Sequence, residues 1–289
     1  MALAFVQSVE LKPYGVLGQQ MKKDKSFVQH VPEPCDCDDA FVDPAGLHHM
    51  QPPGGPSGAG GAAGAIYKSI GIDTHAAFPS DVVAAVKKTC DAKYHLYKKR
   101  GKDVHVVHAV GPDFRKDPSP GKPYTRMQAI DELAVTYKNI FSEFLACGQD
   151  TLRLLPVSGG IFGGAFLTDI APLTHESLQA CYKLLSSVEL RDLEGKDLHM
   201  CIFEEEELPQ FQRAGFVTTG ATMSEKIDIE DNEESQKAAS NIQAAFRGKK
   251  DTATTAVTHG KNPKYVDRLI AVLIAFVCHS TSQTFSDIL

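Results

Sequence analysis

The segment that most constrains this chain is a largely apolar run that ends in a glycine-rich loop. Residues 152–164 read LRLLPVSGGIFGG, and four of the last six residues are glycine. The apolar half predicts a buried strand of a parallel or mixed sheet. Glycines allow positive φ and close approach of a ligand, and successive free N–H groups in such a loop form an anion-binding concavity. A strand followed by this loop is where α/β sheets bind phosphates. A tight turn with Phe162 in the core explains the loop equally well.

A second glycine-rich stretch lies at residues 50–64. Its composition is that of a low-complexity linker. It leads, however, into residues 62–71, AAGAIYKSIG, a pattern typical of a short helix that ends at glycine. A glycine loop that opens a helix places free N–H groups and the positive end of the helix dipole at one point. The sequence therefore offers two candidate anion sites, each beside a regular element.

Predicted strands and helices alternate along residues 1–215, which indicates an α/β domain with helices on both faces of a sheet. We expect His108 to be a satisfied core residue of its strand rather than a catalyst. The strands are expected at residues 2–11, 26–30, 39–43, 93–97, 104–110, 152–157 and 198–203, and the helices at 62–71, 79–90, 125–146, 174–188 and 204–214.

Length, net charge and cysteine content limit the number of domains, the binding partners and the compartment that we expect. A chain of 289 residues holds one large domain plus an appendage, or two domains. Its net charge of −6 argues against non-specific nucleic-acid binding. The seven scattered cysteines suit a reducing compartment, so we expect a cytoplasmic or nuclear protein. Cys35 and Cys37 have no second pair to complete a metal site, and we expect neither a metal nor a cofactor.

The character of the chain changes near residue 216. We expect a domain at residues 1–215, an acidic linker at 216–235 and a tail at 236–289. Residues 265–279 are apolar enough to form a helix that docks on another surface, but the apolar run at 269–278 is too short to span a bilayer. We also find no signal peptide at the start of the chain.

Four segments resemble the macro domain family when they are taken together. They are residues 39–42 (DAFV), 60–66 (GGAAGAI), 108–112 (HAVGP) and 156–163 (PVSGGIFG), and their order and spacing fit over residues 25–215. The resemblance implies a three-layer α/β/α sandwich with a mixed sheet. It also implies a ligand of the ADP-ribose type, free or attached to a protein.

The resemblance assigns roles to particular residues. The loop from Ser158 to Gly163 would cradle a diphosphate through backbone N–H groups, with Phe162 covering the distal ribose. The glycines before the helix at Ala62 would close the other side, and Phe203 would stack on adenine unless it is a plain core residue. The ligand-binding residues implied are Gly46, Gly60, Gly61, Ala62, Ser158, Gly159, Gly160, Ile161, Phe162, Gly163 and Phe203.

The chain departs from the family pattern where catalysis would occur. The asparagine that holds the distal ribose falls on Gly46, and the acidic position of the hydrolase branches falls on Ala63. A methyl group cannot act as a base, so we expect no catalytic residue. The adenine-reading aspartate falls near Val31, where only Glu33 is available. We therefore expect a binding module. An ADP-ribosyl hydrolase, an ADP-ribose-1''-phosphate phosphatase and a ligand-free scaffold stand as alternatives.

The tail carries a second resemblance. Residues 242–248, IQAAFRG, look like the core of an IQ motif. This implies binding of calmodulin or a related EF-hand protein through Ile242, Gln243, Phe246 and Arg247. The alternative is an exposed helix with a small apolar stripe.

Overall fold

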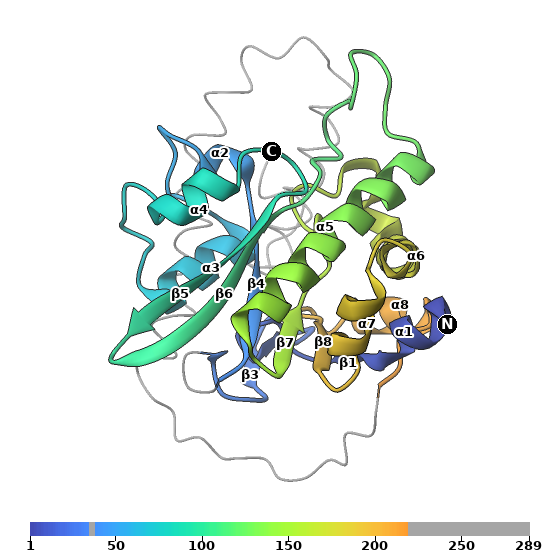
Figure 1. Cartoon of the computed structure of the whole chain (residues 1–289), viewed down its shortest axis with the longest axis horizontal. Helices are drawn as coiled ribbons and strands as arrows, with labels where there is room; N and C mark the ends of the chain where they lie inside the picture. Colours follow the sequence, from blue (N-terminus) through green and yellow to red (C-terminus); the bar gives the residue numbers. More distant parts are fainter. Residues whose placement is uncertain (35–37, 219–289) are drawn as a thin grey trace, which may run out of the picture. The chain divides into compact units, whose positions relative to one another are not determined.

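The computed structural model describes residues 1–34 and 38–218, which belong to the first of the chain's two units, Met1–Lys226 and Ile227–Leu289. A six-stranded sheet with the order β1-β8-β7-β4-β6-β5 forms its centre (Figure 1). Neighbouring strands run parallel, except that β5 is antiparallel to β6, so the sheet is mixed. The strands are β1 (Val9–Lys12), β4 (Ala40–Ala45), β5 (Ala92–Lys99), β6 (Lys102–Val110), β7 (Thr151–Leu154) and β8 (Asp197–Cys201). A separate two-stranded sheet pairs β2 (Gln19–Met21) with β3 (Phe27–Gln29).

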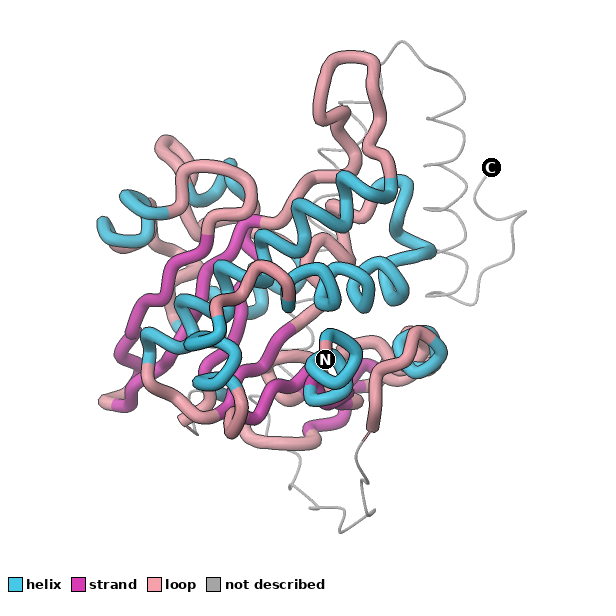
Figure 2. The backbone as a smooth tube through the Cα atoms, turned by 45° about the vertical axis from the view of Figure 1, so that its right-hand side comes forward, coloured by secondary structure: helices cyan, strands magenta, loops and turns pink. Residues whose placement is uncertain are grey.

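Helices cover both faces of the large sheet, and each face has its own hydrophobic cluster (Figures 1 and 2). The predicted three-layer α/β/α architecture is therefore confirmed for the described residues. One face packs against α1 (Ala2–Ser8), α5 (Arg126–Cys147), α6 (Ile170–Tyr182), α7 (Ser187–Leu193) and α8 (Leu208–Arg213). The other packs against α2 (Leu47–Met50), α3 (Gly61–Ile70) and α4 (Ser80–Ala85).

The central strand β4 shows how the sequence specifies these layers. Val42 belongs to one hydrophobic cluster, whereas Phe41 and Ala45 belong to the other. Both faces are buried, so the strand reads as a near-continuous apolar run. Because β4, β6, β7 and β8 are parallel, the loops that follow them leave from the same edge of the sheet. That edge carries the glycine-rich loop after β7.

The prediction of a strand over residues 2–11 is wrong for its first part. Residues Ala2–Ser8 form helix α1, and only Val9–Lys12 form β1. Val6 is fully buried, and the Phe5 ring lies 5.7 Å from the ring of Phe141 and 5.8 Å from that of Tyr182. This packing against α5 and α6 overrides the β propensity of Phe and Val.

Several predicted boundaries also move. The strand expected at 152–157 ends at Leu154, and a short 3-10 helix, η2 (Gly164–Asp169), leads into α6. The helix expected at 174–188 begins earlier, and α7 follows it as a separate helix that Ser186 caps. The helix expected at 204–214 begins only at Leu208, with Pro209 in its first turn, where proline costs no hydrogen bond.

The last described residues return to the first strand. The Leu11 N–H donates to the Val217 carbonyl over 2.8 Å, and Val217 forms a parallel bridge with Glu10. Phe216 beside it is buried, and its ring packs against Phe211. Because β1 lies at one side of the sheet order, this segment covers the sheet's edge there.

Some sequence predictions fall outside the described residues. These are the Cys35 and Cys37 pair, most of the acidic linker, the IQ-like residues Ile242, Gln243, Phe246 and Arg247, and the apolar segment at 265–279. Among the helices of the described part, none is long and apolar enough to cross a membrane.

Candidate functional site

The loop after β7 is fixed by close contact with the end of β6. Ser158 adopts a φ of +62°, and its buried hydroxyl donates to the Pro112 carbonyl over 2.7 Å. A Cβ added at Gly111 would lie 2.3 Å from Val157 Cγ1 and 2.5 Å from Ser158 Oγ. Glycine at position 111 therefore lets the two chain segments touch, and the touching segments hold the loop in place.

This loop presents a run of backbone N–H groups. Its turns use the N–H of Gly159, which donates to Pro156 over 3.0 Å, and that of Gly163, which donates to Gly160 over 2.9 Å. Across residues 1–34 and 38–218, no acceptor pairs with the N–H groups of Gly160, Ile161 and Phe162. A Cβ added at Gly160 would meet no atom within 4 Å, so space is open above the loop. Consecutive free N–H groups beside open space form an anion-binding concavity.

The start of α3 lies opposite this loop. Gly60 is the N-cap, no side chain caps the helix, and the Gly64 N–H makes the bond to the Gly60 carbonyl that closes the first turn. The N–H groups before it carry the partial positive charge of a helix N-terminus. Gly61 and Ala62 are exposed. A Cβ at Gly61 would lie 3.9 Å from Ile161 Cδ1, an ordinary van der Waals distance, so the two glycine-rich segments are neighbours in the fold.

Phe162 of the same loop lies close to Gly46. A Cβ added at Gly46 would lie 3.3 Å from Phe162 Cζ, which brings a third predicted site residue to the same place. The Arg115 guanidinium lies 4.8 Å from the centre of the Phe162 ring. Asp113 accepts two hydrogen bonds from it, of 2.7 and 2.8 Å. The aromatic ring is therefore stacked beneath a positioned cation.

His48 places beside Gly46 a titratable group that the sequence analysis missed. Its Cε1 would lie 2.8 Å from a Cβ at Gly46, so the imidazole occupies the space of the absent side chain. Burial lowers the pKa of His48, and the neighbouring His49, Lys116 and Arg115 lower it further. These effects favour the neutral imidazole, whereas the carboxylate of Asp113 acts in the opposite direction. No motif in the sequence marks His48 or Arg115, because α2 and the loop after β6 bring them together only in the fold.

Phe203 lies at the same edge of the sheet, just beyond Ile202 and the end of β8 at Cys201. It is 39% exposed, so the reading of a plain core residue is wrong. A Cβ at Gly15 would lie 3.1 Å from its ring, and the Phe27 ring lies 6.0 Å away at an angle of 32°. The two rings form an aromatic surface open to solvent.

Glu33, the acidic residue available near Val31, accepts a hydrogen bond of 2.9 Å from Ser69.

Gly46 and Ala63, the two positions where the family pattern predicts catalytic groups, differ in their surroundings. Gly46 adjoins Phe162, whereas Ala63 is buried in the first turn of α3. Neither has a group that can take up a proton. Within the described residues, no cluster of three or more His, Cys, Asp or Glu side chains could hold a metal ion.

Comparison with known proteins gives matches among solved structures only. No family model matches the chain, and no curated protein matches it. A Trypanosoma brucei macrodomain in complex with ADP is 16% identical, over 74% of this chain and 73% of that chain, with a TM-score of 0.43. The same macrodomain in complex with ADP-ribose is 17% identical over 69% and 78%, with a TM-score of 0.39. An Oceanobacillus iheyensis macrodomain with ADP is 14% identical over 70% and 86%, with a TM-score of 0.39.

Proposed function

We propose that this chain is a binding module for ADP-ribose, free or attached to a protein. One observation carries the proposal. Three consecutive unpaired N–H groups, at Gly160, Ile161 and Phe162, lie in a loop whose Ile161 side chain neighbours the uncapped start of α3. Both elements concentrate partial positive charge without any lysine or arginine. A diphosphate has the charge and the small cross-section to lie between them.

Aromatic side chains near the two glycine-rich segments suit the other parts of such a ligand. Phe162, with Gly46 at its edge and Arg115 over its ring, offers an apolar wall and a cation for the distal ribose side. Phe203 and Phe27 offer an aromatic surface for a base. Aromatic rings stack on bases with little dependence on sequence or substituents. Glu33 is a second candidate contact for the base.

The proposal favours binding over hydrolysis. Hydrolysis of an ADP-ribosyl bond needs a group that positions or deprotonates water. Gly46 has no side chain, and Ala63 has a buried methyl group. The alternatives of an ADP-ribosyl hydrolase and an ADP-ribose-1''-phosphate phosphatase therefore have less support than a module that only binds.

Isothermal titration of the full chain with ADP-ribose tests this function, with AMP as a control that lacks the diphosphate. We expect a dissociation constant in the micromolar range, about −8 kcal/mol. Gly160→Glu should abolish binding, because it places a carboxylate in the anion site. Gly160→Ala is the matched control for folding, since its methyl group meets no atom within 4 Å. Unchanged affinity in Gly160→Glu would refute the site, and no heat with the unaltered chain would refute the function.

A second proposal concerns the tail. We infer from residues 242–248 that the tail binds calmodulin or a related EF-hand protein. Ile242 and Phe246 are four residues apart, so a helix would present them on one face, and Gln243 and Arg247 would lie on the neighbouring face. Recovery of an EF-hand protein on the immobilised chain, with calcium and with a chelator, tests this.

A further inference from the structure

Strand β5 forms the second edge of the large sheet, at the opposite end of the strand order from β1. Within residues 1–34 and 38–218, β6 is the only strand that pairs with it. The β1 edge is covered by Val217, but no such segment pairs with β5 in the described part of the chain. With its eight residues, β5 is longer than the very short strands with which proteins protect their edges. An unpaired edge of this length can accept another extended chain as a partner.

Alternate residues of β5 direct their backbone groups away from β6. The Tyr94 N–H donates to the Glu143 carboxylate of α5 over 2.8 Å, so this N–H points away from the neighbouring strand. In an antiparallel pair the backbone groups of successive residues point to opposite sides of the strand. The N–H and C=O groups of Leu96 and Lys98 therefore point the same way as those of Tyr94. Across the described residues, no backbone partner bonds to these groups of Leu96 and Lys98.

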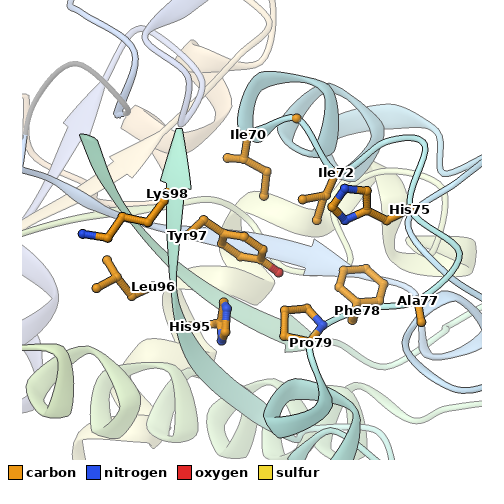
Figure 3. Close-up of a pocket in the computed structure, with 11 residues that line it drawn as sticks. Ile70, Ile72, His75, Ala77, Phe78, Pro79, His95, Leu96, Tyr97 and Lys98 are labelled. Atoms are coloured by element: carbon orange, nitrogen blue, oxygen red, sulfur yellow. The ribbon is translucent and has the colours of Figure 1, made fainter. Parts of the chain in front are cut away.

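A hollow of about 540 Å³ lies along this edge (Figure 3). Its β5 side is formed by residues 95–98, and its other side by the end of α3 and residues from 71–79. Figure 3 shows Tyr97 directed toward the hollow and the side chains of Leu96 and Lys98 on the other face of the strand. Because one hollow touches residues of both strand faces, it extends along the backbone edge between them. An added strand therefore has room beside the backbone groups of Leu96 and Lys98.

The walls of this hollow combine apolar and polar side chains. The apolar ones are Ile70, Ile72, Ala77, Phe78 and Pro79, and the polar ones include His75, His95 and Lys98. Side chains of a strand alternate between its two faces, so an added strand would place every second side chain in the hollow. A mixed wall of this kind suits a stretch of polypeptide, which carries polar and apolar groups side by side.

The turn of the β5–β6 hairpin gives this edge a local positive charge. Residues 98–103 read KKRGKD, four cations against one carboxylate, in a chain whose net charge is −6. The Lys98 side chain is 67% exposed and pairs with Asp103. His95 is paired with Asp81 over 2.8 Å, so the turn rather than the hollow supplies the excess charge. An excess of positive charge favours an acidic partner and speeds its association.

A second copy of this chain fits the edge less well than an acidic partner does. Two β5 strands paired antiparallel about Leu96 would place Lys99 of each copy opposite Lys93 of the other. Like charges directly opposite each other in a sheet are destabilising. The charge of the strand therefore selects against self-pairing.

We propose that the edge of β5 is a docking site for an extended, acidic segment of another protein, which adds to the sheet as a further strand. Backbone bonds to Leu96 and Lys98 would supply affinity, and the hollow and the basic turn would supply specificity. This edge shares no residue with the proposed ADP-ribose site, so either function can exist without the other.

The test uses two blocked octapeptides, one alternating valine with glutamate and the other alternating valine with lysine. Both are titrated into the isotope-labelled full chain, with the amide NMR signals of Leu96 and Lys98 as reporters. We expect the glutamate peptide to shift these signals and to bind about threefold to tenfold more tightly, the ratio that one or two surface ion pairs provide. Equal affinities, or no shift of either signal, would overturn the proposal.

Two variants separate the backbone contact from the side chain. Leu96→Pro removes the outward N–H but no bond to β6, and proline is accepted in edge strands at such positions. Leu96→Ala is the matched control, because it shortens the same side chain and keeps the N–H. The glutamate peptide should bind Leu96→Ala and fail to bind Leu96→Pro, whereas equal affinities for the two variants would contradict strand addition.

Hydrogen exchange of the unaltered chain gives a measurement that does not depend on the folding of Leu96→Pro. The amide protons of Leu96 and Lys98 should exchange more slowly once the glutamate peptide is bound, because strand addition gives them acceptors. Unchanged exchange at saturating peptide would overturn the proposal. Protection that instead rises with protein concentration in the absence of peptide would assign the edge to a second copy and would also overturn it.

Discussion

The contact between the end of β6 and the loop after β7 gives the sharpest prediction. Replacing Gly111 with alanine introduces a Cβ that lies 2.3 Å from Val157 Cγ1 and 2.5 Å from Ser158 Oγ. Ordinary contacts of this kind are longer, so the Val157 and Ser158 side chains must shift, together with the loop that carries them. Overpacking of this sort costs about 1–3 kcal/mol. The bond from Ser158 to Pro112, 2.7 Å long and buried, would also be strained, at about 1 kcal/mol.

We therefore expect Gly111→Ala to lower the free energy of unfolding by about 2 kcal/mol or more. For a domain of this size, each kcal/mol shifts the melting temperature by about 2–4 °C, so the midpoint should fall by roughly 4–8 °C. Circular dichroism melts and urea titrations measure both quantities. ADP-ribose affinity should fall as well, because the displaced loop carries the N–H groups of Gly160 to Phe162.

Gly160→Ala is the matched control, because the same methyl group has open space there and the residue lies outside the left-handed region. Its stability should equal that of the unaltered chain or exceed it by up to about 1 kcal/mol. Equal melting temperatures for the two alanine variants would refute the reasoning, since the crowding at Gly111 would then be absent in solution.

Three further predictions follow from other features. Burial raises the pKa of Glu207 from 4.5 to about 7, and the charge of Glu204 contributes to the shift. Between these two pH values the native state binds more protons than the unfolded state, so the free energy of unfolding falls as the pH rises from 4.5 to about 7. In urea titrations at pH 8, Glu207→Gln should be more stable than the unaltered chain by about 1–2 kcal/mol, which is the full pKa shift discounted for partial exposure. At pH 4 the two proteins should be equally stable. Purified protein should leave mono-ADP-ribosylated protein intact, and turnover that is lost in Gly160→Glu would contradict this. Ile242→Ala with Phe246→Ala should weaken calmodulin binding about thirtyfold or more in a pull-down series, whereas recovery equal to that of the unaltered chain would remove these residues from the interface.

The elements that sequence patterns predicted correctly carry strong local signals. Thr125 and Gln128 form a capping box at the start of α5, and Gly71 ends α3 in the left-handed conformation. The expected strands at 93–97 and 104–110 pair as the hairpin of β5 and β6, which turns at Arg100 and Gly101. Such signals act over a few residues, so they are readable without the fold. Helix α1 lacked one, because its stability comes from the packing of Phe5 against α5 and α6.

The same distinction between local signals and contacts made by the fold applies to the candidate site. The two glycine-rich segments were predicted from composition, and the fold brings Gly61 and Ile161 together. The contacts of Phe162 with Gly46 and Arg115 join segments that lie far apart in sequence, so no local pattern contained them. His108 has the core position that was expected, yet its role as a link between Asp43 and Tyr97 depends on three separate elements.

The return of Val217 to the first strand has a consequence for how this domain can be shortened. An unpaired strand at the side of a sheet is a template for pairing with other chains. Val217 occupies part of that position beside Glu10 and Leu11, and Phe216 anchors it in the core. A fragment that ends at residue 215 would leave the polar backbone of β1 unprotected and a cavity where Phe216 packs. Such a fragment is at risk of edge-to-edge aggregation, whereas one that retains residues 216–218 keeps the segment that covers the edge of β1.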